Sequence, residues 1–277
     1  MTYVAHMKQH YLGLCAIIRD EPYLDEWLAY YVHLGVDAFY LYDNESQVPL
    51  RESLAKWQRF LGPERLVIRG VVGKSLQLDV YNHCLAEHGA KCKWIAFVDA
   101  DEFIVPKVHP DIPSMLEPFE LASGLALCWK MFGTNGHATP PQGLQIENYT
   151  KAMGDDHKAN RTVKVILQPE NIEKFEFNPH IATVKKGDDV MPIVTENVKP
   201  IIIWYAKPPS WDIGQINHYF YRSKHEFYKK LRAPRADTHE LRDQPPGMVI
   251  PEGDVEDLSA LRFLPGVKAV LKKMEAS

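Results

Sequence analysis

The sequence predicts an α/β protein built on an open, mostly parallel twisted sheet with helices on both faces. Short apolar runs alternate with segments whose apolar residues recur at helical spacing, in the order β-α-β-α-β-α-β. One run, residues 94–98, contains five aromatic or aliphatic residues without Gly, Pro or charge, which is typical of a strand buried on both faces. Polar residues follow these runs, and ligands bind beyond the carboxyl ends of strands in such sheets.

The elements can be assigned in order along the chain. Asp20 can cap the first helix and Pro22 suits its first turn. Parallel neighbours joined by right-handed crossovers then follow from the strand-helix alternation. We expect strands over 11–18, 38–42, 66–68 and 94–98, with helices starting near residue 22 and spanning 50–61 and 75–88.

The second half of the chain has a less regular pattern. Residues 213–221 resemble an apolar strand, and Ser223 with Glu226 has the spacing of a capping box at a helix start. Residues 233–253 combine four prolines with several charges, which predicts a linker or a loop that orders on binding. Apolar spacing returns over 257–273, where Pro265 is expected to divide the segment into two short helical pieces.

Composition excludes several classes of protein. The chain has 277 residues, of which 45% are hydrophobic and 25% charged, so it can bury a large core. A net charge of -4 argues against a general nucleic-acid binder. The four cysteines show no C-x-x-C spacing, so we expect buried free thiols and a reducing compartment. Residues 1–10 lack an apolar signal core, and no run approaches a membrane span.

Asp99 and Asp101 directly follow the strand at 94–98. If the extended geometry continues, residues two apart share one face, so both carboxylates aim at one point. Their repulsion is relieved by a divalent cation, which prefers hard oxygen ligands and can itself hold a diphosphate. The alternative is that both acids only end the strand and cap the next element.

Two further loops are expected at the same edge of the sheet. Arg19 and Glu21 follow the first strand, where an arginine can oppose phosphate charge. Asp43 and Asn44 follow the second, where an acid can bind ribose hydroxyls or a base, unless both residues only shape a turn. Neither G-x-G-x-x-G nor a P-loop motif is present, so phosphate would be held by a metal and side chains.

Several segments, in this order, resemble the glycosyltransferase family 92 and family 2-like proteins. The resemblance covers residues 12 to about 232 and includes the D-x-D segment described above, an F-G-x-x-G-H motif and a late H-Y segment. The segments are CAIIRDE at 15–21, HLGVD at 33–37, FYLYDN at 39–44, WIAFVDADEF at 94–103, FGTNGH at 132–137 and INHY at 216–219.

The resemblance implies a GT-A fold with an acceptor-side extension, a nucleoside-diphosphate sugar donor, expected to be a UDP-sugar, and Mn²⁺ or Mg²⁺. It implies one domain over 11–232, with a donor half at 11–105 and an acceptor half at 106–232, followed by a C-terminal loop and short helices at 233–277. The implied site residues are Arg19, Glu21, Asp43, Asn44, Gln77, Asp99, Ala100 and Asp101 for the donor, Asp99, Asp101 and His218 for the metal, and Phe132, Asn135 and His137 for the acceptor.

Two of these roles have structural alternatives. An imidazole such as that of His218 suits manganese better than magnesium, yet a histidine within a strand is often a packing residue. Inverting transfer needs a general base near the acceptor hydroxyl. Glu147 is the leading candidate, although it also suits a solvated helix start, and the competing acids are Asp155, Asp156, Asp212 and Asp237.

The sequence therefore predicts a metal-dependent, inverting glycosyltransferase that acts on a glycan or other hydroxyl acceptor. A nucleotidyltransferase, a nucleotide-sugar hydrolase and a non-catalytic carbohydrate-binding protein remain as alternatives on the same fold. We expect no nucleic-acid partner and a cytoplasmic location, with contact at the inner face of the membrane left open.

Overall fold

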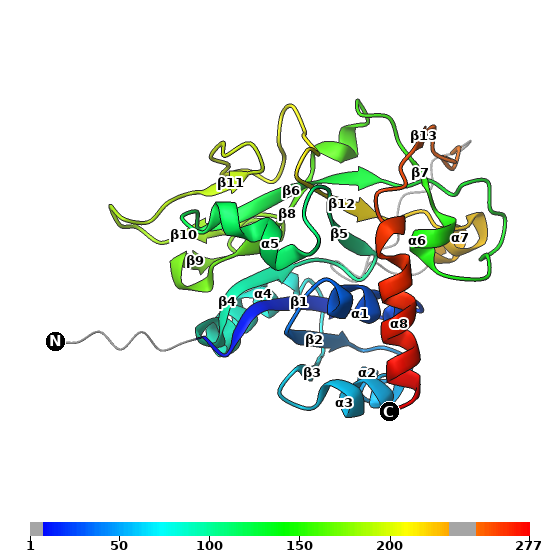
Figure 1. Ribbon diagram of the computed structural model, residues 1–277, viewed down its shortest axis with the longest axis horizontal. Helices are drawn as coiled ribbons and strands as arrows, with labels where there is room; N and C mark the ends of the chain where they lie inside the picture. Colours follow the sequence, from blue (N-terminus) through cyan, green and yellow to red (C-terminus); the bar gives the residue numbers. More distant parts are fainter. Residues whose placement is uncertain (1–7, 233–247) are drawn as a thin grey trace.

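The computed structural model describes residues 8–232 and 248–277, which form a nine-stranded central sheet and two small two-stranded sheets. The expected α/β class with an open, mostly parallel sheet is confirmed (Figure 1). The central order is β3 (Leu66–Val71), β2 (Ala38–Asn44), β1 (His10–Ile18), β4 (Cys92–Phe97), β8 (Val163–Leu167), β6 (Gly124–Met131), β12 (Gly214–His218) and β5 (Glu102–Pro106), with β11 (Ile193–Thr195) beside β6.

The remaining elements surround this sheet. The small sheets pair β9 (Ile172–Lys174) with β10 (Thr183–Val184) and β7 (Lys151–Ala152) with β13 (Val255–Glu256). The helices are α1 (Leu24–His33), α2 (Leu50–Ser53), α3 (Ala55–Leu61), α4 (Gln77–His88), α5 (Ile112–Leu116), α6 (Gln145–Asn148), α7 (Lys224–Arg232) and α8 (Leu264–Glu275). Among the described residues, no helix is long and apolar enough to cross a membrane.

The two halves of the sheet differ in strand direction. β3, β2, β1 and β4 are all parallel, as the strand-helix alternation predicted. β8 then runs antiparallel to both β4 and β6, and β5 runs antiparallel to β12. This change places the start of β5, which follows Asp101, beside the end of β12, which carries His218.

Alternating side chains divide the core between the two faces of the sheet. On β1, Leu14 and Ala16 pack toward α1, α3 and α8, while Cys15 and Ile17 pack toward α4. The sheet is thus covered by helices on both faces, as expected. All four cysteines lie in the described part of the chain, and all are buried free thiols, as predicted.

Four local predictions need correction or refinement. The helix over 50–61 is divided at Leu54 into α2 and α3. Asp20 does not cap α1, since its φ is 51° and its carboxylate accepts the Gln47 N–H instead. The extended geometry of β4 ends at Phe97, before the two aspartates. Two helical pieces are present over 257–273 as expected, a 3-10 helix at Leu261–Phe263 and α8 from Leu264, but α8 continues through Pro265, which lies in its first turn, where no N–H bond is lost.

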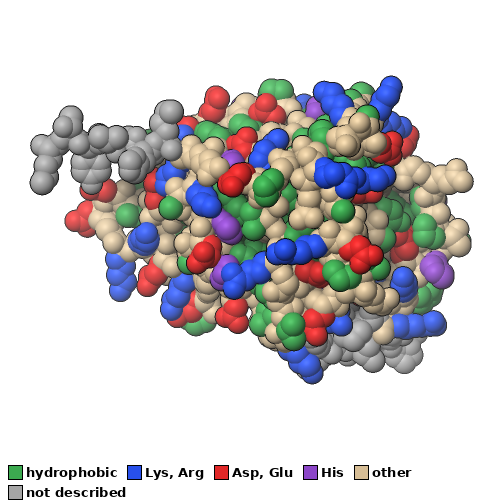
Figure 2. All heavy atoms as spheres, turned by 90° about the horizontal axis from the view of Figure 1, so that it is seen from below, with side chains coloured by type: hydrophobic (Ala, Val, Ile, Leu, Met, Phe, Trp, Pro, Cys, Tyr) green, Lys and Arg blue, Asp and Glu red, His purple; other side chains and the backbone are tan. Residues whose placement is uncertain are grey.

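Helix α8 lies along the edge of the molecule and packs on α1 (Figure 1). The close approach requires Gly266, since a Cβ there would lie 2.1 Å from the His33 ring. The predicted loop at 233–253 lies mostly outside the described residues. On the face seen in Figure 2, basic and acidic side chains are interspersed.

Candidate active site

The turn between β4 and β5 brings the two aspartates together. The Glu102 N–H donates to the Asp99 carbonyl at 3.1 Å, which closes a tight turn over Asp99, Ala100 and Asp101. The turn is fixed on its other side by the Tyr219 N–H, which donates to the Asp101 carbonyl at 2.9 Å. The acids therefore converge through a turn, and not through the strand alternation that was expected.

Both carboxylate oxygens of Asp99 are engaged by protein groups. Gln77 lies in the first turn of α4, and its side-chain amide donates a hydrogen bond of 2.8 Å to Asp99 Oδ1. The Lys164 ammonium, from β8, lies 2.9 Å from Oδ2. Burial alone would raise the pKa of Asp99, but Lys164 holds it below its usual range. Asp99 is therefore an ionised and firmly oriented carboxylate.

Lys164 also contacts Glu102, so that Asp99, Lys164 and Glu102 form a three-residue cluster. The side chains of Lys164 and Glu102 are both 0% exposed, and Lys164 Nζ lies 3.5 Å from Glu102 Oε2. The same oxygen accepts the Asp99 N–H at 2.8 Å. Burial raises the pKa of Glu102 above its usual range, against the opposing effect of Lys164. Lys164 and Glu102 support the turn from the protein interior, while the Asp99 side chain is 34% exposed.

Asp101 has a different set of partners. Its Oδ2 accepts a hydrogen bond of 2.6 Å from Lys230 on α7. Its Oδ1 lies 3.5 Å from Nε2 of His218 at the end of β12. Burial would raise the pKa of Asp101, but Lys230 and His218 hold it well below its usual range. Asp101 is therefore ionised over the whole neutral pH range.

The His218 ring is held by strand register and by aromatic neighbours. His218 pairs with Glu102 across β12 and β5, so it is fixed beside the turn. Its ring centroid lies 4.3 Å from that of Trp129, which also contacts the ring of His180 at 5.3 Å. Burial lowers the pKa of His180 to about 3, so this second imidazole is neutral at physiological pH.

Glu21, in the loop after β1, is one of the charged residues near Asp101. Its carboxylate lies 2.9 Å from the guanidinium of Arg222, which has a φ of 50° and stacks over the Tyr23 ring at 4.6 Å. Burial raises the pKa of Glu21, while Arg222 lowers it. Arg222 also donates to the Gln145 amide oxygen at 2.8 Å. The ion pair therefore links the carboxyl edge of β1 to the segment that precedes α7.

The other predicted donor residues lie along the same sheet edge. Ile18 pairs with Asp43, so Arg19 and Asn44 follow at neighbouring ends of β1 and β2. Asn44 is fully buried. Asp43 accepts the N–H groups of Ser46 and Leu50 at 3.1 and 2.8 Å, which is the turn chemistry that sequence reasoning left open.

The predicted acceptor residues have clear structural contacts. Phe132 is 1% exposed and packs against Tyr219, so its ring belongs to the core and offers no face for stacking on a sugar. Asn135, with a φ of 50°, bonds Thr150 and the Lys151 N–H. The ring of His137 packs on Tyr149 at 5.5 Å. Contact of Asn135 and His137 with an acceptor stays a prediction.

Glu147 lies on α6, and its carboxylate pairs with Lys268 of α8 at 3.0 Å. Among residues 8–232 and 248–277, no hydrogen bond or ion pair joins Glu147 to the acids of the turn, so its role as general base stays a prediction. Among its competitors, Asp155 pairs with Lys130 and Asp212 donates its N–H to Glu196. Asp237 lies outside the described residues.

The arrangement can be tested for its fit to a divalent cation. Within residues 8–232 and 248–277, no group of three or more His, Cys, Asp or Glu side chains is arranged to hold a metal ion. Asp101 and His218 supply two suitable ligand atoms 3.5 Å apart. Magnesium-type sites commonly use one or two carboxylates and take their remaining ligands from substrate phosphates and water. The residues therefore fit a cation that arrives together with a diphosphate, but not a cage made by protein alone.

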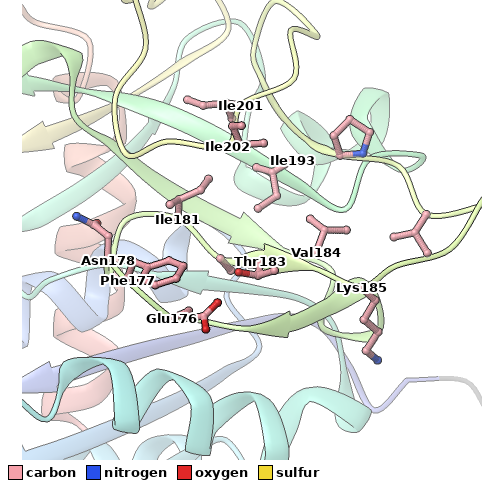
Figure 3. Close-up of a pocket in the computed structure, with 13 residues that line it drawn as sticks. Glu176, Phe177, Asn178, Ile181, Thr183, Val184, Lys185, Ile193, Ile201 and Ile202 are labelled. Atoms are coloured by element: carbon pink, nitrogen blue, oxygen red, sulfur yellow. The ribbon is translucent and has the colours of Figure 1, made fainter.

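A separate apolar cavity of about 440 Å³ lies between the β9-β10 hairpin and the segment around β11 (Figure 3). Ile181, Val184, Ile193 and Ile201 line it, and none of the predicted site residues does. It is therefore distinct from the acidic turn.

Three basic residues of the site were not identified from the sequence: Lys164, Arg222 and Lys230. The sequence could have indicated Lys164, because it is the only charged residue in the apolar strand β8. Lys230 had none, because it is one of two adjacent lysines on an amphipathic helix.

Comparison with known sequences gives a family. The model of glycosyltransferase family 92 matches residues 15–245. A family 92 protein of Arabidopsis thaliana is 25% identical over 258 residues, which cover 85% of this chain and 40% of that protein. A relative from Oryza sativa subsp. japonica is 24% identical over 218 residues, covering 74% of this chain and 35% of the relative. The chain thus spans less than half the length of these relatives.

Comparison with solved structures gives more distant matches. Staphylococcus aureus TarS residues 1–349 match with a TM-score of 0.39 and 14% identity, over 57% of this chain and 47% of that chain. A UDP-glucose pyrophosphorylase complexed with UDP-glucose matches with a TM-score of 0.32 and 11% identity, over 58% of this chain and 77% of that chain. On the sequence match, which covers well over half of its length, the protein belongs to glycosyltransferase family 92.

Proposed function

We propose that the protein is a metal-dependent glycosyltransferase that transfers a sugar from a UDP-sugar to a hydroxyl group of a glycan or another acceptor. Family membership supports the reaction class. The observation that carries the proposal is the pairing of Asp101 with His218 beside Asp99, at the edge of the sheet where open α/β proteins bind nucleotides. Arg19, Glu21, Asp43, Asn44 and Gln77 are proposed to border the nucleotide at that edge.

The proposed chemistry is electrostatic. A cation bound by Asp101 and His218 would supply charge stabilisation for the diphosphate that leaves. Asp99, held by Gln77 and Lys164, keeps its carboxylate fixed, so the turn needs little rearrangement when the donor binds. The neighbouring Arg222 keeps a permanent positive charge near the same point.

The test is a UDP-release assay on the full chain with a panel of UDP-sugars, a panel of sugar acceptors and Mn²⁺. Asp101→Asn and His218→Gln are expected to lower kcat/KM by about a hundredfold or more, the scale of losing one electrostatic group from a site. The matched control is Glu120→Gln, which removes a surface ion pair with Lys93 and should leave turnover within twofold.

The other enzyme classes give different results in the same assay. Release of UDP that does not depend on an acceptor would indicate a hydrolase. Formation of pyrophosphate from a nucleoside triphosphate and a sugar phosphate would indicate a nucleotidyltransferase. Saturable sugar-nucleotide binding without turnover under any condition would indicate a non-catalytic protein, and each of these results would overturn the proposal.

Inversion at the anomeric carbon is part of the proposal. The NMR coupling constant of the anomeric proton in the first product reports the outcome directly. A product with the same anomeric configuration as the donor would exclude a single inverting displacement and would overturn this part alone.

A further inference from the structure

The guanidinium of Arg222 is buried, yet it makes few hydrogen bonds. The residue is 8% exposed, and its Nε donates to the Gln145 amide oxygen at 2.8 Å. Its Nη2 lies 2.9 Å from Glu21 as an ion pair, but this buried nitrogen has no aligned hydrogen bond. Across residues 8–232 and 248–277, no group accepts a hydrogen bond from Nη1. Because buried polar groups are normally satisfied, the incomplete set of N–H bonds indicates an acceptor from outside the chain.

Protein groups nevertheless fix the position of this guanidinium. Its Cζ lies 4.6 Å from the centroid of the Tyr23 ring, and Glu21 and Gln145 hold two of its nitrogens. Gln145 is 1% exposed and is itself fixed by the bond of 2.7 Å from its N–H to Glu26. The φ of Arg222 is 50°, a sparsely populated conformation that in residues other than glycine clusters at functional sites. Arg222 is therefore a rigid donor whose orientation is set before any ligand binds.

Arg222 belongs to the same short segment that binds the acidic turn. Tyr219, at the start of that segment, donates its N–H to the Asp101 carbonyl at 2.9 Å. Burial would lower the pKa of Arg222, but the charges of Glu21 and Asp101 raise it, so both acids act on the guanidinium. Arginine binds phosphate oxygens through parallel N–H bonds. A phosphate held by the unfilled N–H groups would therefore lie close to Asp101.

We propose that Arg222 binds the diphosphate of the sugar donor, with the N–H groups of Nη1 donating to oxygens of the phosphate that carries the sugar. The proposal rests on the proposed function for the identity of the ligand, but its test measures binding and does not require sugar transfer. Glu21 and Gln145 keep their contacts with Arg222, so no protein contact has to be broken. The nearby acids repel a bare diphosphate, so binding needs a divalent cation as well.

The experiment compares the binding of UDP, UMP and inorganic pyrophosphate to the full chain by titration calorimetry in excess Mg²⁺. UMP lacks the phosphate that Arg222 is proposed to contact. Arg222→Met should bind UDP and pyrophosphate about tenfold to a hundredfold more weakly than the wild type, the range for hydrogen bonds to charged groups, and UMP with unchanged affinity. Arg222→Lys keeps the charge but not the planar fork, so its affinity for UDP should lie between the two.

Arg262→Met is the matched control. Arg262 also stacks on an aromatic ring, that of Phe263 at 4.5 Å, and it donates to the carbonyl oxygens of Pro106 and His109. In the part of the chain that the structure describes, none of these contacts is with the acidic turn, so the variant should leave all three affinities unchanged.

A second variant keeps the test decisive if Arg222→Met folds poorly. The single substitution leaves the carboxylate of Glu21 without its cation, whereas Glu21→Gln/Arg222→Met removes both charges of the pair. Thermal unfolding without ligand shows which variants fold, and the double variant should show the same loss of preference for UDP over UMP. Equal weakening of UDP and UMP would indicate a distorted site, and unchanged affinity for UDP would leave only water at Nη1. Either result would overturn the assignment.

Failure of this assignment and failure of the proposed function are distinguishable. Sugar transfer by Arg222→Met with the wild-type KM for the donor and the wild-type kcat would keep the transferase and overturn the role of Arg222. Binding of UDP or pyrophosphate that depends on Arg222, without transfer to any acceptor, would keep that role and count against the transferase. A wild type that binds neither ligand in the presence of Mg²⁺ would contradict both.

Discussion

Asp99 and Asp101 are separated by one residue, yet their surroundings give them different properties. Each carboxylate has its own lysine, so two like charges can be ionised within one turn. Asp99 has both oxygens bound by protein groups, whereas Asp101 shares its charge with a lysine that is partly exposed. The pair is therefore asymmetric, because Asp99 is 34% exposed and contacts a buried lysine, whereas Asp101 is 13% exposed and contacts a partly exposed one.

We expect Lys164 to contribute strongly to the free energy of unfolding, because it contacts both Asp99 and Glu102. Lys164→Met leaves the buried Glu102 and the partly exposed Asp99 without this cation, and should lower the free energy of unfolding by about 3–5 kcal/mol, the usual cost of breaking a buried ion pair. Chemical denaturation at pH 7 measures the loss. The double variant Lys164→Met/Glu102→Gln should recover part of it, and a single variant as stable as the wild type would contradict the charge assignment.

Glu26 predicts a pH dependence that is separate from the acidic turn. It is 3% exposed and accepts the N–H groups of Gln145 and Ile146, and burial raises its pKa to about 7. A carboxyl whose pKa is raised in the folded state binds more protons there, so stability is full below the unfolded pKa near 4.5 and falls as pH rises to about 7.

The expected loss from Glu26 is roughly 3 kcal/mol between pH 4.5 and pH 7. Glu26→Gln, which cannot ionise, should remove this decline, as measured by denaturation at both pH values. The depressed pKa values of Asp99 and Asp101 act in the opposite direction, but only at lower pH, where these acids become protonated. An unchanged slope in Glu26→Gln would show that the group is ionised across this range.

The sequence identified the acids of the site more readily than their cations. Asp99 and Asp101 follow an apolar strand, a pattern that indicates their position directly. The partners of these acids lie 65 and 129 positions further along the chain, because Lys164 is on β8 and Lys230 is on α7. Such pairs depend on strand order, which a single sequence does not reveal. A lone lysine within an apolar strand, such as Lys164, nevertheless indicates a buried acidic partner.

At the level of elements, the contact of α8 with α1 depends on one glycine. Gly266→Ala places a Cβ 2.1 Å from the His33 ring, so one helix has to move. The expected loss in unfolding free energy is about 1–3 kcal/mol, the usual cost of overpacking. Gly70→Ala is the matched control, because no heavy atom lies within 4 Å of its Cβ position. Equal Tm values for the two variants would refute this explanation.

The sequence predicts the helices and strands that have a strong local pattern. It does not predict the direction of a strand or its neighbours in the second half of the sheet. The parallel half follows from strand-helix alternation, since each apolar run precedes a helix that has to cross over the sheet. β8 and β6 carry no comparable signal, because an apolar run does not specify its direction or its neighbour. The division expected at Pro265 falls instead before Leu264, because a proline is also tolerated in the first turn of a helix and the sequence does not show where α8 begins.

At the scale of the whole molecule, the two halves share one core. The larger buried cluster includes Leu14 from β1, Leu125 from β6 and Ile216 from β12. We therefore expect residues 11–105 and 106–232 to unfold in a single transition, with equal calorimetric and van't Hoff enthalpies. Two resolved heat-capacity peaks in differential scanning calorimetry would instead indicate independent domains.

The pairing of β5 with β12 also determines when the site around Asp101 becomes complete during biosynthesis. Glu102 and His218 are joined in register, although more than one hundred residues of chain are translated between them. The parallel strands β1 to β4 leave the ribosome first, and folding of a nascent chain can begin there. The imidazole beside Asp101 arrives only when β12 emerges, so a translation product that ends before β12 contains both aspartates but lacks His218.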